Sequence, residues 1–124
     1  MTAIKASSTR NFNKEQSELQ CPVTYVMNRI GGHWKPIILY QLMSGTKRYS
    51  ELKKGIPAIT EKMLIQHLKQ LQEDNIVIRE MVAVMPPVVN YKLSAAGEEL
   101  VPVLKAMVKW AQKDHVREVT VSMQ

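Results

Sequence analysis

The feature that most constrains the fold of this sequence is a change of hydrophobic period at residue 76. In the segment before it, three leucines recur at the spacing of one helical face: Leu64, Leu68 and Leu71. Thr60 is a favourable N-cap, and Asn75 readily takes the left-handed conformation at which many helices end. The pattern therefore predicts a helix that begins after Thr60 and ends at Asn75.

The segment after this helix has the composition and period of β-strands. Residues 76–93 are rich in β-branched side chains and are divided by Met85-Pro86-Pro87. In the second half apolar residues alternate with polar ones, at Val89, Tyr91 and Leu93. Proline cannot donate to a strand ladder, so pairing has to stop at the tip. We predict a β-hairpin that follows the helix directly.

The upstream helices also have recognisable ends. Pro22 suits the first position of a helix, and Gly31-Gly32 ends that helix. A second helix is predicted to start around His33 to Pro36 and to stop at Ser44-Gly45, with apolar side chains on one face. Ser50 is a good N-cap for a short helix through Lys54.

The remaining segments complete the order of elements. A short extended segment is predicted at Lys47-Arg48-Tyr49, and Gly55-Ile56-Pro57 separates the short helix from the longer one. Ser94 is the predicted cap of a long final helix, which Pro102 should bend. Helix, helix, short helix, longer helix, hairpin and long helix is the order of a winged helix-turn-helix domain. The predicted class is mainly α with a small β-hairpin (α+β).

Length and composition fit one such domain. The chain has 124 residues, of which 45% are hydrophobic and 23% are charged, enough for a single packed core. We assign residues 1–20 to a flexible N-terminal arm, because they are polar and lack periodicity. Residues 21–114 form the predicted domain, and residues 115–124 a C-terminal tail.

Positive charge is concentrated in the middle of the chain. The formal net charge is +6, and residues 21–75 carry eight basic against four acidic side chains. Residues 98–124 are balanced, with four of each sign. A basic domain with a pI near 9.6 favours a polyanionic partner, most simply nucleic acid.

The sequence gives little support to an enzyme, a membrane protein or a secreted protein. One cysteine excludes an intrachain disulfide, and no segment approaches the roughly 20 apolar residues of a membrane helix. The N-terminus lacks the apolar core of a signal peptide, so we expect a cytoplasmic protein. His33, His67 and His115 lack metal-ligand spacing, and we expect neither a metal, nor a cofactor, nor catalysis.

The helix after Thr60 has a polar face opposite its leucines. Lys62, Gln66 and Lys69 recur there at i, i+4 and i+7. Glutamine can bond an adenine edge twice, and lysine can reach guanine or a phosphate. Thr60 and Glu61 lie in the first turn, where such helices usually touch base edges. The alternative is an ordinary solvated face.

Four basic residues around the preceding short helix suit DNA phosphates: Lys47, Arg48, Lys53 and Lys54. Only Glu51 opposes them within this segment. A solubilising surface is the alternative interpretation.

Several short motifs resemble the HxlR-type winged helix-turn-helix transcription regulators, which are MarR-like. They are Cys21-Pro22-Val23, Gly31-Gly32-His33-Trp34-Lys35, Lys47-Arg48-Tyr49-Ser50-Glu51-Leu52, Lys62-Met63-Leu64 and Pro86-Pro87-Val88-Val89-Asn90-Tyr91-Lys92-Leu93. The resemblance covers about residues 21–113. It implies a bacterial regulator that binds double-stranded DNA as a homodimer joined through its terminal helices. It also implies a recognition helix in the major groove and a wing near the backbone or minor groove.

The final helix has a wide apolar stripe, and its members are the predicted dimer interface: Leu100, Leu104, Met107, Val108 and Ala111. Packing within one chain is the alternative. A dimer would place two recognition helices about 34–36 Å apart and favour an inverted-repeat operator.

Cys21 is a candidate redox sensor. As the predicted N-cap, its sulfur would lie at the positive end of a helix dipole, which lowers a thiol pKa. The resemblance implies a reaction with a small electrophile, oxidant or thiol, as in some members of the family. A small buried hydrophobe is the alternative.

The expected function is sequence-specific DNA binding as a transcriptional regulator, with repression favoured because a chain this short has no domain to recruit polymerase. The alternative is a winged helix that serves as a protein-interaction module without DNA.

Overall fold

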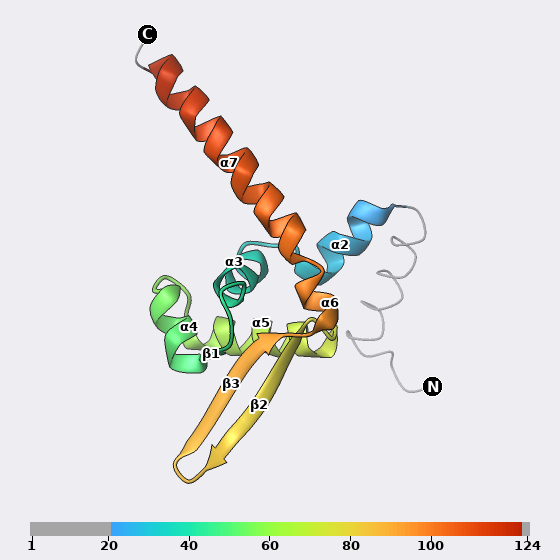
Figure 1. Ribbon diagram of the computed structural model, residues 1–124, viewed down its shortest axis with the longest axis vertical. Coiled ribbons are helices and arrows are strands. Elements are labelled where there is room, and N and C mark those ends of the chain that lie inside the picture. The colour runs from blue at the N-terminus through green and yellow to red at the C-terminus, as the bar shows by residue number, and fades with distance from the viewer. Residues whose placement is uncertain (1–20, 123–124) are drawn as a thin grey trace, which may run out of the picture.

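The computed structural model describes residues 21–122, with side chains through residue 117. The predicted arm, residues 1–20, lies outside the described residues. The elements, in chain order (Figure 1), are α2 (Pro22–Ile30), α3 (Trp34–Leu42), β1 (Lys47–Arg48), α4 (Tyr49–Gly55), α5 (Glu61–Glu73), β2 (Val77–Val84), β3 (Pro87–Leu93), α6 (Ala95–Glu98) and α7 (Val101–Ser122). This order confirms the predicted winged helix-turn-helix class.

Helix α5 has the predicted ends. The Thr60 hydroxyl accepts a 3.1 Å hydrogen bond from the Met63 N–H, which satisfies a donor that has no partner inside the helix. Asn75 has φ 58°, the left-handed conformation expected of it. The three leucines of the stripe are fully buried.

The hairpin is part of a three-stranded antiparallel sheet with strand order β1-β3-β2. Strand β1 pairs with β3 through Lys47 opposite Tyr91 and Arg48 opposite Asn90. The sequence predicted the extended segment but not its partner. This pairing matters for the site because it fixes the start of α4 against the hairpin.

The core lies where α3, α4, α5 and the sheet meet. Its fully buried members are Ile38, Leu39, Leu42, Leu52, Ile59, Leu64, Leu68 and Leu71. Lys35 is also buried, which no sequence pattern predicted. Because the core faces of α4 and α5 are held by these contacts, their opposite faces point to solvent.

The predicted cap of the short helix was wrong. Helix α4 begins at Tyr49 with Arg48 as N-cap, and Ser50 lies inside its first turn. The Glu51 carboxylate accepts a 2.9 Å hydrogen bond from the Arg48 N–H. That acceptor moves the start of the helix two residues earlier than Ser50 would.

The single long C-terminal helix predicted after Ser94 is divided in two. The Ser94 hydroxyl accepts a 3.0 Å bond from the Gly97 N–H and caps the short α6. Pro102 lies in the first turn of α7 rather than in a helix interior, so it bends nothing. Helix α7 also continues through Ser122, beyond residue 114 where the predicted tail begins.

Candidate nucleic-acid interface

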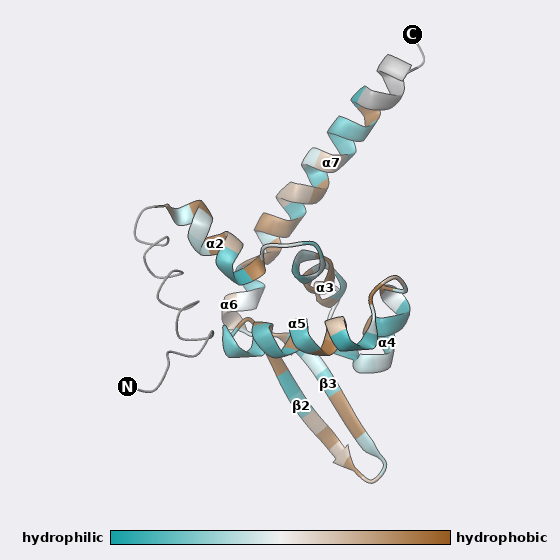
Figure 2. Cartoon of the chain, turned by 180° about the vertical axis from the view of Figure 1, so that it is seen from behind, coloured by the Kyte–Doolittle hydropathy of each residue, from teal (hydrophilic) through white to brown (hydrophobic). Residues whose placement is uncertain are grey.

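Helix α5 presents a continuous solvent-exposed face. Its exposed side chains are Glu61, Lys62, Ile65, Gln66, Lys69 and, in the last position, Glu73. In Figure 2 much of this helix is in hydrophilic shades, while the buried leucines hold its other side. The structure thus brings together the predicted trio Lys62, Gln66 and Lys69, next to Glu61 in the first turn.

Thr60 is exposed, but its hydroxyl oxygen already serves as the helix cap. Its O–H hydrogen stays available to donate. Thr60 therefore has a structural role as the helix cap, and its hydroxyl can still donate to a base or a phosphate.

The sequence interpretation missed Ile65. This side chain is 57% exposed and lies next to Lys62 and Lys69, three residues before it and four after it on the helix surface. An apolar residue on an otherwise polar face was the signal that could have identified it. An isoleucine here can contact the C5-methyl group of thymine, as alanine and threonine side chains do in known complexes.

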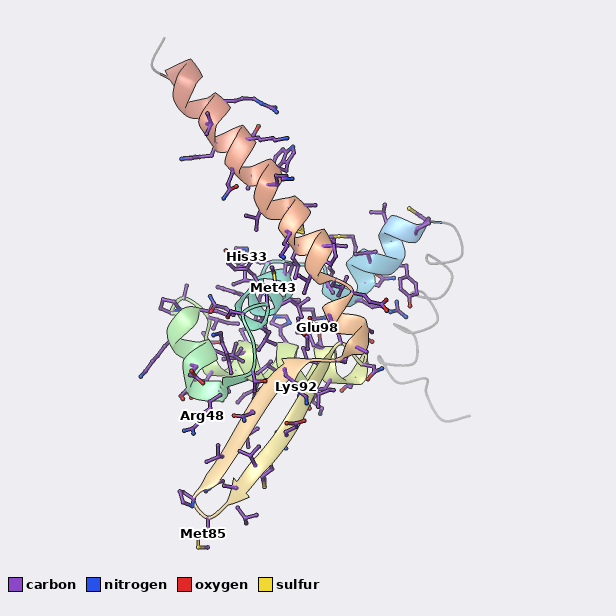
Figure 3. All side chains as sticks on the ribbon, in the orientation of Figure 1. His33, Met43, Arg48, Met85, Lys92 and Glu98 are labelled. Atoms are coloured by element: carbon purple, nitrogen blue, oxygen red, sulfur yellow. The ribbon has the colours of Figure 1, made fainter. Side chains whose placement is uncertain are left out.

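The four basic residues form two pairs rather than one cluster. Lys47 and Arg48 precede α4, whereas Lys53 and Lys54 lie in its last turn, about 9 Å away along the helix axis. Arg48 and Lys54 are exposed, and Lys47 and Lys53 are half-buried. Figure 3 shows Arg48 on the side of α4 that faces the hairpin.

Lys53 and the neighbouring Tyr49 have defined local environments. The Lys53 ammonium donates a 3.4 Å hydrogen bond to the Pro57 carbonyl, across the turn between α4 and α5. The Tyr49 hydroxyl is buried; burial raises its pKa, and the negative charge of Glu61 adds to the effect. Among the residues that the structure describes, the Tyr49 hydroxyl has no hydrogen-bond partner, so Tyr49 contributes by packing against the core.

The hairpin extends away from the body on the side of α4 and α5, opposite the free end of α7 (Figure 1). The Ser94 hydroxyl donates a 2.7 Å hydrogen bond to the Asn75 carbonyl, which joins the end of the hairpin to the end of α5. Lys92 and Glu80 form a 2.7 Å ion pair across the two strands. The exposed face of α5 and the hairpin are therefore held in one fixed arrangement.

The predicted interface stripe on α7 has two kinds of residue. Leu104 is only 3% exposed and Leu100 is half-buried, and both pack in the core of their own chain. Met107 and Ala111 are exposed, and Val108 is half-buried. Intrachain packing therefore accounts for the first part of the stripe and leaves the second part uncovered.

An apolar groove of about 290 Å³ runs between α3 and α7. It is lined by Pro36, Ile37, Tyr40, Leu104, Met107, Val108 and Ala111. Beyond it Trp110 is 64% exposed. On α2 only Ile30 is buried, while the apolar side chains of Val23 and Met27 are exposed.

Cys21 is the N-cap of α2, as predicted, and is half-buried. No hydrogen bond of ordinary length caps the helix through its sulfur. The N–H and hydroxyl of Thr24, followed by the N–H of Val23, nevertheless lower the pKa of the thiol from its ordinary value. This environment raises the thiolate fraction at neutral pH.

Two other site classes find no support in the described residues. Within residues 21–122, no three His, Cys, Asp or Glu side chains gather where a metal ion could bind. No helix in the same range has both the length and the apolarity needed to cross a membrane.

His67 is half-buried. Burial of the imidazole lowers its pKa, and the positive charge of Lys35 lowers it further.

These elements define a winged helix-turn-helix protein, and the known structures agree. A structure of the redox regulator HypR in its reduced form is 37% identical, with a TM-score of 0.75, over 82% of this chain and 99% of that chain. A quinone-bound structure of YodB from Bacillus subtilis is 34% identical, with a TM-score of 0.64, over 75% and 99%. HypR is described as a redox regulator and YodB as a transcriptional regulator.

The family follows from the sequence comparisons. Residues 29–119 match the HxlR-like helix-turn-helix family. The uncharacterized HTH-type transcriptional regulator YkvN of Bacillus subtilis (strain 168) is 44% identical over 93 residues, which is 75% of this chain and 79% of YkvN. The chain therefore belongs to the HxlR-like helix-turn-helix family and is a transcriptional regulator, a class that is not enzymatic.

Proposed function

We propose that this protein is a cytoplasmic repressor that binds an inverted-repeat DNA operator as a homodimer. The observation that carries the proposal is the exposed face of α5, on which Lys62, Ile65 and Gln66 lie side by side. Gln66 can pair with an adenine edge, Lys62 with guanine, and Ile65 with a thymine methyl group. In this arrangement α5 is the recognition helix in the major groove.

The basic residues around α4 hold the phosphates. Arg48 and Lys54 are exposed at opposite ends of that helix, so they can reach phosphates on either side of the groove. Lys47 is adjacent to Arg48 and Lys53 to Lys54, and each adds a further positive charge. These contacts fix the position of α5 without reading sequence.

The second subunit covers the apolar surface that one chain leaves exposed. Helix α7 projects far beyond the body (Figure 1), and a helix with so few tertiary contacts gains little stability by itself. Met107, Val108 and Ala111 are the proposed contact residues on α7. Light scattering at micromolar concentration should report a dimer, and Met107→Lys should shift it toward monomer and abolish the preference for an inverted repeat.

Cys21 is the proposed signal site. Its lowered pKa favours thiolate chemistry. Of the similar proteins, HypR is described as a redox regulator, and one structure of YodB is described as quinone-bound. With one cysteine per chain, the partner of the sulfur is an electrophile, a small thiol or Cys21 of the second subunit. Modification at the start of α2 would then change the dimer and its affinity for DNA.

The function is tested by selection of duplexes from a randomised pool by the reduced full-length protein. We expect an inverted repeat with half-site centres about 10 base pairs apart. At about 150 mM salt, the selected duplex should bind at least about a thousandfold more tightly than a random one. Equal and weak binding to both would contradict the proposal and favour a winged helix that binds another protein.

A further inference from the structure

The outer half of the hairpin carries no polar side chain at all. From Met81 to Val89 the sequence is MVAVMPPVV. Just inside this segment, Glu80 and Lys92 neutralise each other in a 2.7 Å ion pair. Arg79 is exposed and lies opposite Tyr91, one ladder position nearer the tip than Lys92. The tip therefore offers no cation to a DNA phosphate.

These apolar side chains are also unusually exposed. Met85 is 92% exposed and Val84 is 77% exposed, and Met81 and Val82 are each more than half exposed. Figure 2 shows hydrophobic shades along both strands in the half nearest the turn. In Figure 3 Met85 is at the far end of the hairpin and points away from the body. An apolar surface of this kind on an extended hairpin indicates a binding partner.

The position of the tip favours DNA as that partner. The hairpin is joined to α5 by the Ser94–Asn75 hydrogen bond and lies on the same side of the body as α4 and α5. When α5 occupies a major groove, an arm on this side lies over the adjacent backbone. An uncharged tip gains no electrostatic attraction from phosphates. The faces of stacked bases are apolar, so apolar side chains can pack against them. Methionine and proline are among the side chains that unstack base steps in the minor groove.

We propose that the hairpin tip is an apolar wedge that enters the minor groove next to each half-site and opens a base step, with Met85 as the leading side chain. This inference rests on the proposed function. It implies that the contribution of residues 81–89 to affinity is largely independent of salt, because these uncharged side chains release no counterion. It also implies a preference for a flexible pyrimidine–purine step under the wing and a bent duplex.

The test uses the full-length protein and the selected duplex, labelled at both ends for energy transfer. Met85→Ser should lower affinity about tenfold, equivalent to losing part of the burial of one methionine. The slope of affinity against salt should stay the same, and the bend should decrease. Met85→Leu, which is close in volume, should keep most of the affinity and the bend. Val103→Ser, an exposed apolar-to-polar change on α7, is the matched control and should behave as wild type.

A second arm changes the DNA. Replacing the pyrimidine–purine step under the wing by a stiff AA step should weaken the wild type but not Met85→Ser. Suppose that the wild type prefers the selected duplex and that Met85→Ser binds and bends this duplex as well as the wild type does. The proposal of an apolar wedge is then wrong, and the proposed function stands. If the wild type prefers no duplex, both fail together. If Met85→Ser instead changes the oligomeric state and leaves DNA affinity unchanged, the tip is a protein contact and the inference is overturned.

Discussion

The Ser94 hydroxyl donates to the Asn75 carbonyl at 2.7 Å while it accepts from the Gly97 N–H at 3.0 Å. The buried Ser94 side chain thus joins the end of α5 to the beginning of α6, directly after the end of β3. The Ser94 N–H adds a 2.9 Å bond to the Ile76 carbonyl. The angle between α5 and the hairpin depends on this junction.

Replacing Ser94 by alanine should destabilise the protein by about 2 kcal/mol, because α6 loses its cap and the Asn75 carbonyl loses its partner. Urea unfolding measures the change. Thr60→Ala removes an exposed cap of similar geometry and should cost about 1 kcal/mol. A Ser94→Ala protein no less stable than Thr60→Ala would contradict the role of the junction.

Gly97 lies against the same junction. A Cβ at this position would collide with the Ile76 carbonyl oxygen, which is backbone and cannot move aside easily. We expect Gly97→Ala to cost about 2 kcal/mol or more in thermal or urea unfolding. Gly55→Ala is the matched control, because its Cβ would meet only the flexible Gln41 side chain. Equal stability of the two variants would rule out the proposed collision.

His67 should make the stability of the protein depend on pH. Burial and the charge of Lys35 lower its pKa below the ordinary 6.5, so the unfolded chain takes up a proton before the folded protein does. The contribution of His67 is therefore complete above pH 6.5 and is lost as the pH falls through the folded pKa. His67→Gln should flatten the fall in urea midpoint between pH 7 and 5. His115→Gln, at an exposed position of α7, should keep the wild-type profile; two identical profiles would refute the assignment.

The thiol of Cys21 should react with iodoacetamide at a lower pH than a free thiol does, because its pKa is lowered. Diamide or a quinone should then change the affinity for the selected duplex by about tenfold, a typical coupling between two sites. Fluorescence anisotropy with reduced and treated protein measures this. Cys21→Ser should not respond, and an equal response of the two proteins would mean that Cys21 is not the sensor.

The sequence predicted best where local chemistry decides the structure. Thr60 and Asn75 mark the ends of α5 because a hydroxyl cap and a left-handed residue act within one turn. The cap at Ser50 failed because Glu51 reaches back to the Arg48 N–H. The break before α7 was missed, since Ser94 caps only one turn and the chain restarts with Pro102 in the first turn of the next helix.

Features that depend on contacts distant in the chain could not be predicted. The pairing of β1 with β3 joins Lys47 to Tyr91, and no local pattern specifies that partner. The burial of Leu104 likewise depends on the position of α7 relative to the core. For the site, helical periodicity placed Lys62, Gln66 and Lys69 on one face, but Ile65 was overlooked because apolar residues were assigned to the core.

The central claim is that α5 reads bases while the residues of α4 hold phosphates. It is tested most directly by the affinities of Gln66→Ala and Lys53→Ala for the selected and the random duplex across a range of salt concentrations. Gln66→Ala should lose affinity for the selected duplex by about tenfold or more and hardly at all for the random one. Lys53→Ala should weaken both duplexes alike and reduce the salt slope by about 1. If the two variants lose affinity in the same way on both duplexes, the claim is wrong.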